Sequence, residues 1–253
     1  MEQPDHLLGL RHQPAPFPLY ARNHEYYSED AVLTSGQAVA FISGGKEYGV
    51  IIAPKHLAFN DTEINRTGVS VFMTEQQARE NELRGTQAAI EDAGALGVMT
   101  AFNRVGITAA NAHTGLLKNI LRGEWGFKGL ESQDFIMNPN YAVLKEYALN
   151  GGTMTTFTGE NTMAAVSEKF AYWTTENVGQ DTELMSAIKQ AMTWQAYALA
   201  NSNALDGMAS STRLVSVRTW YDNALVAVQV VFAALTVLAA AMYVLNDRKS
   251  KKQ

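Results

Sequence analysis

The alternation of short apolar segments with longer helical segments constrains the fold of this chain more than any other feature. Strands are predicted at residues 48–53, 97–101, 129–133 and 153–157, with helical segments between them and short glycine-containing links. Parallel strands need crossover connections of about a dozen residues or more, usually helices. The sequence therefore predicts an α/β fold built on a parallel sheet.

Helix signals fit the same pattern. Ser28, Glu29 and Asp30 precede a helical segment and are typical of an N-cap, and Thr74 with Gln77 forms a capping-box pattern. Helices are predicted at residues 31–44, 74–92, 116–121 and 139–149, and two more across residues 163–201.

Composition excludes several classes of protein. The chain has 253 residues, of which 47% are hydrophobic and 18% charged, so it is long enough for one sizeable globular unit. A net charge of −5 without a basic cluster in the part before the apolar C-terminal run argues against a nucleic-acid partner. The absence of cysteine excludes disulfides and thiolate metal sites, and the five histidines have no metal-ligand spacing. We therefore expect no cofactor and no metal.

The C-terminal region contains 22 consecutive residues without a charge, 224–245. About 20 such residues span the hydrocarbon core of a bilayer. Trp220 and Tyr221 precede the run as interfacial aromatic residues do, and Arg248, Lys249, Lys251 and Lys252 follow it. The positive-inside rule then predicts a single-pass protein of the cell membrane, with the rest of the chain outside. The alternative is a buried core helix.

This interpretation divides the chain into residues 1–200 as a partial barrel domain, 201–223 as a linker, 224–245 as a transmembrane helix and 246–253 as a basic cytoplasmic tail. Residues 1–18 lack the basic and long apolar regions of a signal peptide. Export would then depend on an upstream segment that has been removed or on another chain.

Two polar stretches follow or contain predicted strands. The first, PKHLAFNDTEINRTG, spans residues 54–68, and the second, RGEWGFKGLESQDF, spans residues 122–135 and contains Asp134. In parallel α/β barrels the active site forms at the carboxyl ends of the strands. Both stretches are therefore candidates for an active site.

These stretches, together with ARNHEYYSED at residues 21–30 and VMTAFNRVG at residues 98–106, resemble the catalytic barrel of glycoside hydrolase family 3, β-glucosidase type. The family's segments run approximately GRNFEYFSEDP, PKHFALNDQETNR, VMTSYNRING and GFKGFVVSDW. Four motifs in one order over about residues 16–158 make the match specific. The resemblance implies a partial TIM-type (β/α) barrel, here followed by a single transmembrane helix.

The resemblance also implies site residues. Asp134 stands at the position of the family's catalytic nucleophile, although an Asp after a strand can also cap a turn. Lys55 and His56 match a pair that binds the hydroxyls of the substrate sugar. An isolated pair of this kind, however, usually lies on the protein surface without a function. Arg22 and Arg66 match arginines that contact the sugar or orient the nucleophile, and each can equally form an ion pair with Glu25, Glu29 or Glu63.

Several positions depart from the family pattern. Glu131 lies in a strand that the family keeps apolar, where an unpaired glutamate is costly. Phe135 replaces a tryptophan, and Phe102 stands where many members have a tyrosine. The chain contains no identifiable general acid/base, which in much of the family comes from a second domain.

Only four or five strands can be found, whereas a barrel of this type has eight. The family's opening strands have no counterpart before Arg11. We therefore expect a second chain, or a segment missing from this one, to supply the remaining strands and the general acid/base. Two functions stay open: a membrane-anchored retaining glycosidase acting on terminal non-reducing β-D-glucosyl or related residues, and a non-catalytic carbohydrate-binding or scaffold protein at the cell surface.

Overall fold

A computed structural model describes residues 8–11, 22–60, 63–66, 68–135, 143–156, 173–206 and 218–250. The chain forms two compact units, Met1–Asp206 and Gly207–Gln253. Each is described by itself below.

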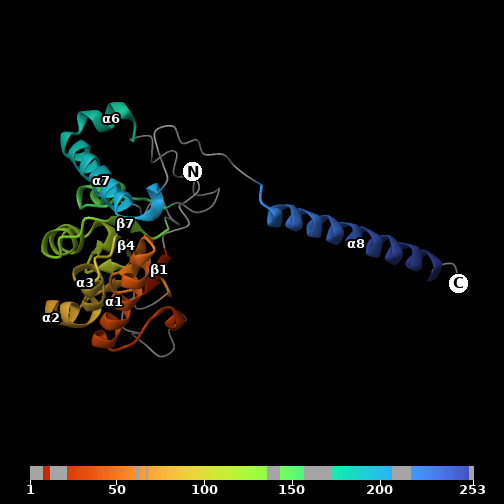
Figure 1. Ribbon diagram of the computed structural model, residues 1–253, viewed down its shortest axis with the longest axis horizontal. Coiled ribbons are helices and arrows are strands. Elements are labelled where there is room, and N and C mark those ends of the chain that lie inside the picture. Colours follow the sequence, from red (N-terminus) through yellow and green to blue (C-terminus); the bar gives the residue numbers. More distant parts are fainter. Residues whose placement is uncertain are drawn as a thin grey trace. The chain divides into compact units, whose positions relative to one another are not determined.

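The first unit is built on a parallel sheet. Its strands are β1 (Leu8–Arg11), β2 (Ile52–Leu57), β4 (Gly97–Thr100) and β7 (Leu130–Gln133), in that order across the sheet, and every neighbouring pair is parallel. A parallel bridge from Ser132 to Met154 continues the order beyond β7. This arrangement confirms the predicted α/β fold with a parallel sheet (Figure 1).

The structure differs from the strand predictions in three places. β1 lies before residue 12, where the sequence showed no strand, and it pairs with β2 through the register Leu10 to Pro54. β2 ends at Leu57 rather than at residue 53, so it runs through Pro54. Proline removes one ladder hydrogen bond and usually marks a strand edge, but here pairing on both sides of β2 outweighs that loss. The predicted strand at 153–157 is reduced to the bridge at Met154 within the described residues.

Helices connect the strands on the pattern predicted. The crossover between β1 and β2 contains α1 (Ala31–Glu47), whose N-cap Asp30 accepts a hydrogen bond from the backbone N–H of Leu33 at 2.7 Å. The segment predicted as one helix from Thr74 is instead α2 (Glu75–Gln77), a π-helical turn η2 (Ala78–Glu82) and α3 (Arg84–Glu91). Thr74 is the N-cap, as predicted, and accepts from the N–H of Gln77.

The remaining helices follow β4 and β7. Gly115–Glu124 forms a π-helix, η4, in place of the predicted shorter helix. The described parts of the later helical predictions are α4 (Leu144–Leu149), α6 (Thr175–Gln180) and α7 (Thr182–Ala200), while residues 139–142 and 163–172 lie outside the described residues. A small second sheet contains β3 (Ser70–Val71), β5 (Arg104–Val105) and β6 (Thr108–Ala109), and single 3-10 turns are η1 (Asn23–Glu25), η3 (Ala110–Ala112) and η6 (Asn203–Leu205).

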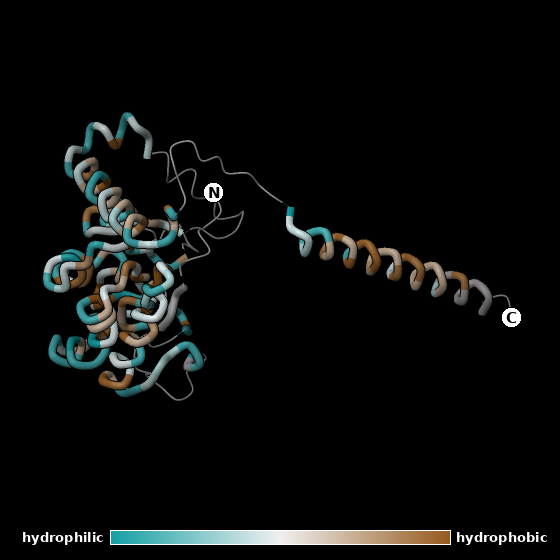
Figure 2. Tube along the Cα trace, in the orientation of Figure 1, coloured by the Kyte–Doolittle hydropathy of each residue, from teal (hydrophilic) through white to brown (hydrophobic). Residues whose placement is uncertain are grey.

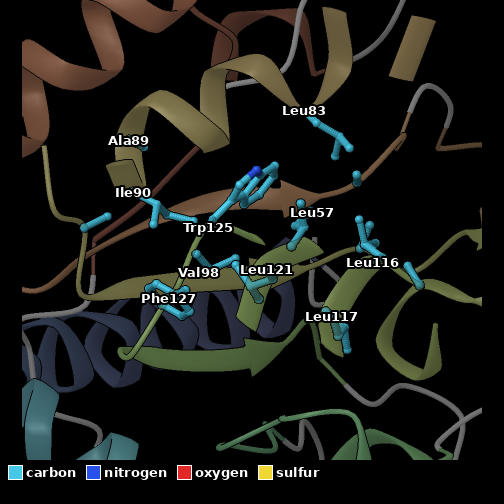
Figure 3. Packing of buried hydrophobic residues seen from close by; sticks show 14 of the residues in the cluster. Leu57, Leu83, Ala89, Ile90, Val98, Leu116, Leu117, Leu121, Trp125 and Phe127 are labelled. Atoms are coloured by element: carbon cyan, nitrogen blue, oxygen red, sulfur yellow. The ribbon is translucent and has the colours of Figure 1, made fainter. Parts of the chain in front are cut away.

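The core lies between the large sheet and the helices that follow its strands. Figure 3 shows the rings of Trp125 and Phe127 beside Ile90, Val98 and Leu121, and all five side chains are buried. Burying one such side chain contributes about 1.5–3 kcal/mol. This packing holds β2, β4 and β7 in a fixed relation to one another.

Arg122 ties the end of η4 to the start of β7. Its guanidinium donates hydrogen bonds to the carbonyls of Phe127, Gly129 and Gly151 at 2.7–3.1 Å. It also stacks on the ring of Trp194 in α7, 3.8 Å from the ring centroid. One side chain thus satisfies three carbonyls where several loops meet, so Arg122 is a structural residue.

The second unit contains one long helix, α8 (Trp220–Ser250). Figure 2 shows hydrophobic residues along the middle of this helix. The segment Trp220–Tyr243 has 24 residues, and an 18-residue window within it has a mean hydropathy of 2.4. A helix of 24 residues is about 36 Å long. Its length and composition suit it to cross a bilayer, a criterion that the core helix of a soluble protein can also meet.

Glu131 is buried in the middle of β7, with none of its surface exposed. Burial raises its pKa to about 7, although the charge of Arg122 acts in the opposite direction. The free-energy cost predicted for a charged glutamate in this strand is therefore present. The carboxyl group avoids that cost by staying protonated up to near neutral pH.

We predict that Glu131→Gln stabilises the first unit at alkaline pH. A carboxyl whose folded pKa lies above its unfolded value loses stability as pH rises from about 4.5 to about 7. The variant lacks that loss, so its free energy of unfolding should exceed that of the original chain by about 3 kcal/mol at pH 8. Urea unfolding of the full chain between pH 4 and pH 8 measures this difference. The exposed control Glu91→Gln should change stability by no more than about 0.5 kcal/mol, and an unchanged pH dependence in Glu131→Gln would contradict the prediction.

Candidate active site

A buried histidine and aspartate meet at the carboxyl ends of two strands. His56 lies near the end of β2, and Asp134 directly follows β7. The His56 Nε2 atom lies 3.1 Å from Asp134 Oδ2, with 1% and 8% of their side chains exposed. Strand β4 lies between β2 and β7. The backbone N–H of Asp134 donates a hydrogen bond to the carbonyl of Thr100, the last residue of β4, at 3.3 Å. Two residues predicted from separate motifs are therefore in direct contact.

The surroundings of Asp134 keep it ionised. Burial opposes ionisation, but the hydrogen bond and charge of His56 outweigh it, with help from the Phe135 N–H and the Arg66 charge, so the pKa of Asp134 falls below its ordinary value. The Phe135 N–H donates to Asp134 Oδ1 at 2.8 Å. Asp134 is thus an oriented carboxylate, the form that a nucleophile requires.

The other predicted cations belong to one network with two glutamates. Lys55 Nζ lies 3.5 Å from Glu25 Oε2, and Arg22 donates to both oxygens of Glu25 at 2.6 and 2.8 Å. Arg22 also donates to Glu63 Oε1 at 3.2 Å, and Arg66 pairs with Glu63 Oε2 at 2.9 Å. Cations and carboxylates therefore alternate from Lys55 to Arg66.

Arg66 connects this network to the buried pair. Its guanidinium carbon lies 4.4 Å from the centroid of the Phe102 ring, a cation–π arrangement. Phe102 stands where the family pattern often has a tyrosine, and here its ring supports the arginine whose charge lowers the pKa of Asp134. The ion-pair roles predicted for Arg22 and Arg66 are present: Arg22 pairs with Glu25 and Glu63, and Arg66 pairs with Glu63.

Backbone contacts hold the segment after His56 in place. Phe59 has a positive φ of 65°, which is uncommon for a residue other than glycine. The Asn103 side chain donates to the carbonyl of Ala58 at 3.0 Å, and the Tyr26 hydroxyl donates to that of Asn60 at 3.0 Å. Asn103 and Tyr26 belong to the other two sequence motifs, so all four motifs meet at this edge of the sheet.

The sequence did not single out Glu25 and Glu63 as site residues. The sequence indicated them only as possible ion-pair partners of the arginines, although both lie inside motifs that resemble the family. Two glutamates among several cations give a balance of charge that could have indicated their role. Over the part of the chain that the structure describes, no group of three or more His, Asp or Glu side chains is arranged to hold a metal ion.

Residues 17–168 match the model of the glycosyl hydrolase family 3 N terminal domain, which is more than half of the chain. The chain belongs to this family. Its predicted family resemblance is therefore confirmed, and its α/β fold is that of the family's β-glucosidases.

Individual relatives support the same assignment. The chain is 42% identical over 118 residues to β-glucosidase B of Emericella nidulans, and 38% identical over 117 residues to a β-glucosidase of Rhizobium radiobacter. These matches cover 47% and 46% of this chain but only 14% of each relative. Among solved structures, β-glucosidase 3B from Thermotoga neapolitana has a TM-score of 0.69 at 27% identity, covering 78% of this chain and 28% of that one.

We predict that His56→Asn raises the pKa of Asp134. The variant removes the imidazole nitrogen at 3.1 Å and its charge while the carboxyl group stays buried, so less of the effect of burial on the pKa is offset. Because a depressed folded pKa stabilises the protein above the unfolded value of about 3.9, the variant should also unfold at higher pH on acidification. Carboxyl ¹³C NMR of the full chain labelled at aspartate measures the titration. The exposed control His24→Asn should leave it unchanged, and an unshifted Asp134 in His56→Asn would refute the role of the pair.

Proposed function

We propose that this chain is part of the catalytic barrel of a membrane-anchored retaining glycosidase that hydrolyses terminal non-reducing β-D-glucosyl or related residues. The buried contact between His56 and Asp134 is the observation that carries the proposal. It combines an ionised carboxylate with a fixed orientation at the carboxyl ends of parallel strands, where barrel enzymes assemble their active sites. The β-glucosidase relatives support the substrate class.

Asp134 acts as the nucleophile in this proposal. Its carboxylate oxygen bonds to the anomeric carbon as the glycosidic C–O bond breaks, and the departing oxygen takes a proton from a carboxylic acid about 5–5.5 Å from Asp134. Water then attacks the same carbon and gives its proton to that second group, now a carboxylate. The sugar leaves with its original configuration, and Asp134 is free again.

Lys55, His56, Arg22 and Arg66 bind the sugar in this scheme. Sugar hydroxyls donate and accept hydrogen bonds, and charged groups make the stronger ones. Glu25 and Glu63 hold three of these cations by ion pairs, so the cations need little reordering when a sugar binds. A β-glucosidase 3B structure with glucose, from Thermotoga neapolitana, supports binding of a monosaccharide by this fold.

A second polypeptide or a further segment completes the barrel in this proposal and supplies the general acid/base. The described part of the chain contains four strands of the large sheet and one bridge, whereas a TIM-type barrel has eight. Sheet edges left open invite association with another strand.

The apolar helix α8 anchors the protein in this proposal. Its span of 24 residues, Trp220–Tyr243, is predominantly apolar and exceeds the roughly 20 residues that a bilayer core needs. The basic residues after the span favour a cytoplasmic C-terminus, with the barrel part outside the cell membrane.

Trapping with a 2-fluoro β-glucoside that carries a good leaving group tests the enzymatic proposal. Fluorine at C2 slows hydrolysis of the covalent intermediate, so an adduct should accumulate on Asp134. The reagent is applied to the purified full chain and to membranes of cells that naturally produce it, and peptide mass spectrometry locates the adduct. Asp134→Asn should abolish labelling, whereas Asp92→Asn, an exposed aspartate, should leave it unchanged. Absence of an adduct from both preparations would contradict turnover and leave sugar binding as the function.

Membrane anchoring has a separate test. We expect the full chain to stay in the membrane pellet after alkaline carbonate extraction, because about 20 apolar residues hold it there. Leu235→Arg, near the middle of the span, costs about 3 kcal/mol of insertion free energy and should move part of the chain to the supernatant. The matched change Arg218→Leu, outside the span, should not. Full extraction of the unchanged chain would disprove the anchor.

A further inference from the structure

A cavity of about 520 Å³ lies between the two π-helical segments of the first unit, η2 and η4. The small sheet lines a third side of it through Val71 in β3 and Val105 in β5. Small-molecule sites are usually clefts of about 300–1,000 Å³. Neither His56 nor Asp134 is among the described residues that line this cavity, so it is separate from the candidate active site.

The interior of the cavity is apolar. Phe59, Leu83 and Leu116 line it and are no more than 3% exposed. At its edge, Phe72 has 74% of its surface exposed. An aromatic ring that lies in water beside an apolar hollow is stabilised when an apolar body covers it. The main part of a ligand for this cavity is therefore apolar.

The walls of the cavity have an uncommon helical geometry. In η2 the N–H of Leu83 donates to the carbonyl of Ala78, five residues earlier, at 2.9 Å. At the end of η4 the N–H of Trp125 donates to the carbonyl of Ile120, also at 2.9 Å. Such π-helical hydrogen bonds are rare and occur frequently at functional sites. Their presence in both walls favours a binding site independently of the apolar lining.

An ion-pair cluster joins the two walls and sets the charge of the cavity. Arg79 in η2 donates from Nε to Glu75 at 2.8 Å, and from its two terminal nitrogens to Glu124 in η4 at 2.6 and 3.0 Å. All three residues line the cavity, and no other lysine or arginine does so among the described residues. Two carboxylates therefore face one cation whose nitrogens are all engaged. A carboxylate, phosphate or sulfate on a ligand would meet a net negative charge.

His113 supplies the cavity with a hydrogen-bond donor. The backbone N–H of Leu116 donates to Nδ1 of His113 at 3.0 Å. Burial lowers the pKa of the His113 ring below its ordinary value, so the ring is neutral at neutral pH. A neutral imidazole that accepts at Nδ1 carries its proton on Nε2. His113, which lines the cavity, can therefore donate one hydrogen bond to an oxygen atom of a ligand.

We propose that this cavity binds an uncharged, mainly apolar molecule with one acceptor oxygen, in the chemical class of aromatic alcohols and ethers. The ring system packs on Phe59 and Leu116, and the oxygen accepts from His113. The proposal rests neither on glycosidase activity nor on membrane anchoring, because it uses neither the His56–Asp134 pair nor α8.

Two other classes of ligand fit the cavity less well. A fatty acid or another anion would meet the excess of carboxylates at Glu75 and Glu124. A sugar has hydroxyls over its whole surface, and most of them would face apolar side chains without hydrogen-bond partners. The cavity therefore does not suit a second sugar.

Binding of 2-naphthol tests the proposal, because this probe is uncharged at neutral pH and has one hydroxyl on an aromatic body. The full chain is labelled with ¹³C at its methionine methyl groups, and the signal of Met73, which lines the cavity, is assigned with Met73→Leu. 2-Naphthol should shift this signal with a dissociation constant below about 1 mM, and should not shift that of Met99 in β4. All samples contain the same concentration of detergent, so partitioning of the probe into micelles is equal.

Matched probes and variants define the ligand class and the site. Naphthalene, which lacks the hydroxyl, should bind about fivefold more weakly, and the anion 2-naphthoate at least about tenfold more weakly. Ala78 lines the cavity, so Ala78→Leu fills part of it and should weaken binding of 2-naphthol at least about tenfold. The control Ala196→Leu, at an exposed position of α7, should bind 2-naphthol as the original chain does.

Each other outcome counts against the proposal. No shift of Met73 in the original chain, or a shift confined to Met242 in α8, would overturn it and show uptake of the probe by micelles only. Equal affinity for 2-naphthoate would overturn the proposed ligand class, and unchanged affinity in folded Ala78→Leu would overturn the placement of the site. If that variant does not fold, the Met73 signal of the original chain with the three probes still decides.

Discussion

The parallel register of β2, β4 and β7 is the constraint on which the rest of the first unit depends. Parallel strands end on the same edge of a sheet, so the residues that follow them meet in space. His56 and Asp134 meet in this way across β4, with Thr100 as the hydrogen-bonded link to Asp134. The core around Trp125 and the hydrogen bonds from Arg122 to the carbonyls of Phe127 and Gly129 hold the strands in that register. Without it, the two motifs would carry the same residues and form no site.

Charge is arranged differently at the site and behind it. At the site, glutamates alternate with Lys55, Arg22 and Arg66, so each ion has a partner while remaining partly accessible. Behind it, in the layer between β7 and the helices, Glu131 is fully buried, and its raised pKa lets it lose its charge near neutral pH. Hence the glutamate that departs from the family pattern places no permanent charge inside the strand. The depressed pKa of Asp134 shows that its surroundings still favour the anion.

The quality of prediction varied with the range of the interaction. The cap by Asp30 and the N-cap at Thr74 were predicted correctly, because each depends on residues within one turn. The extent of β2 was not, because local signals such as Pro54 end a strand, whereas pairing with strands distant in sequence extends it. The π-helical turns η2 and η4 were missed for a related reason: an apolar period close to 3.6 residues predicts a helix but does not distinguish its hydrogen-bond pattern.

The amino-acid sequence by itself determined the family, the parallel α/β class and every candidate site residue except Glu25 and Glu63, since each of these follows from local motifs and their order. Its apolar C-terminal run likewise determined that a long helix forms there, as α8. Only the tertiary structure decided which partners the site residues have. The contact of His56 with Asp134, the bridging by Glu63 of Arg22 and Arg66, and the ring of Phe102 under Arg66 join residues from separate motifs. Their distances depend on strand register and loop conformation, which arise from packing of the whole unit and not from any one segment.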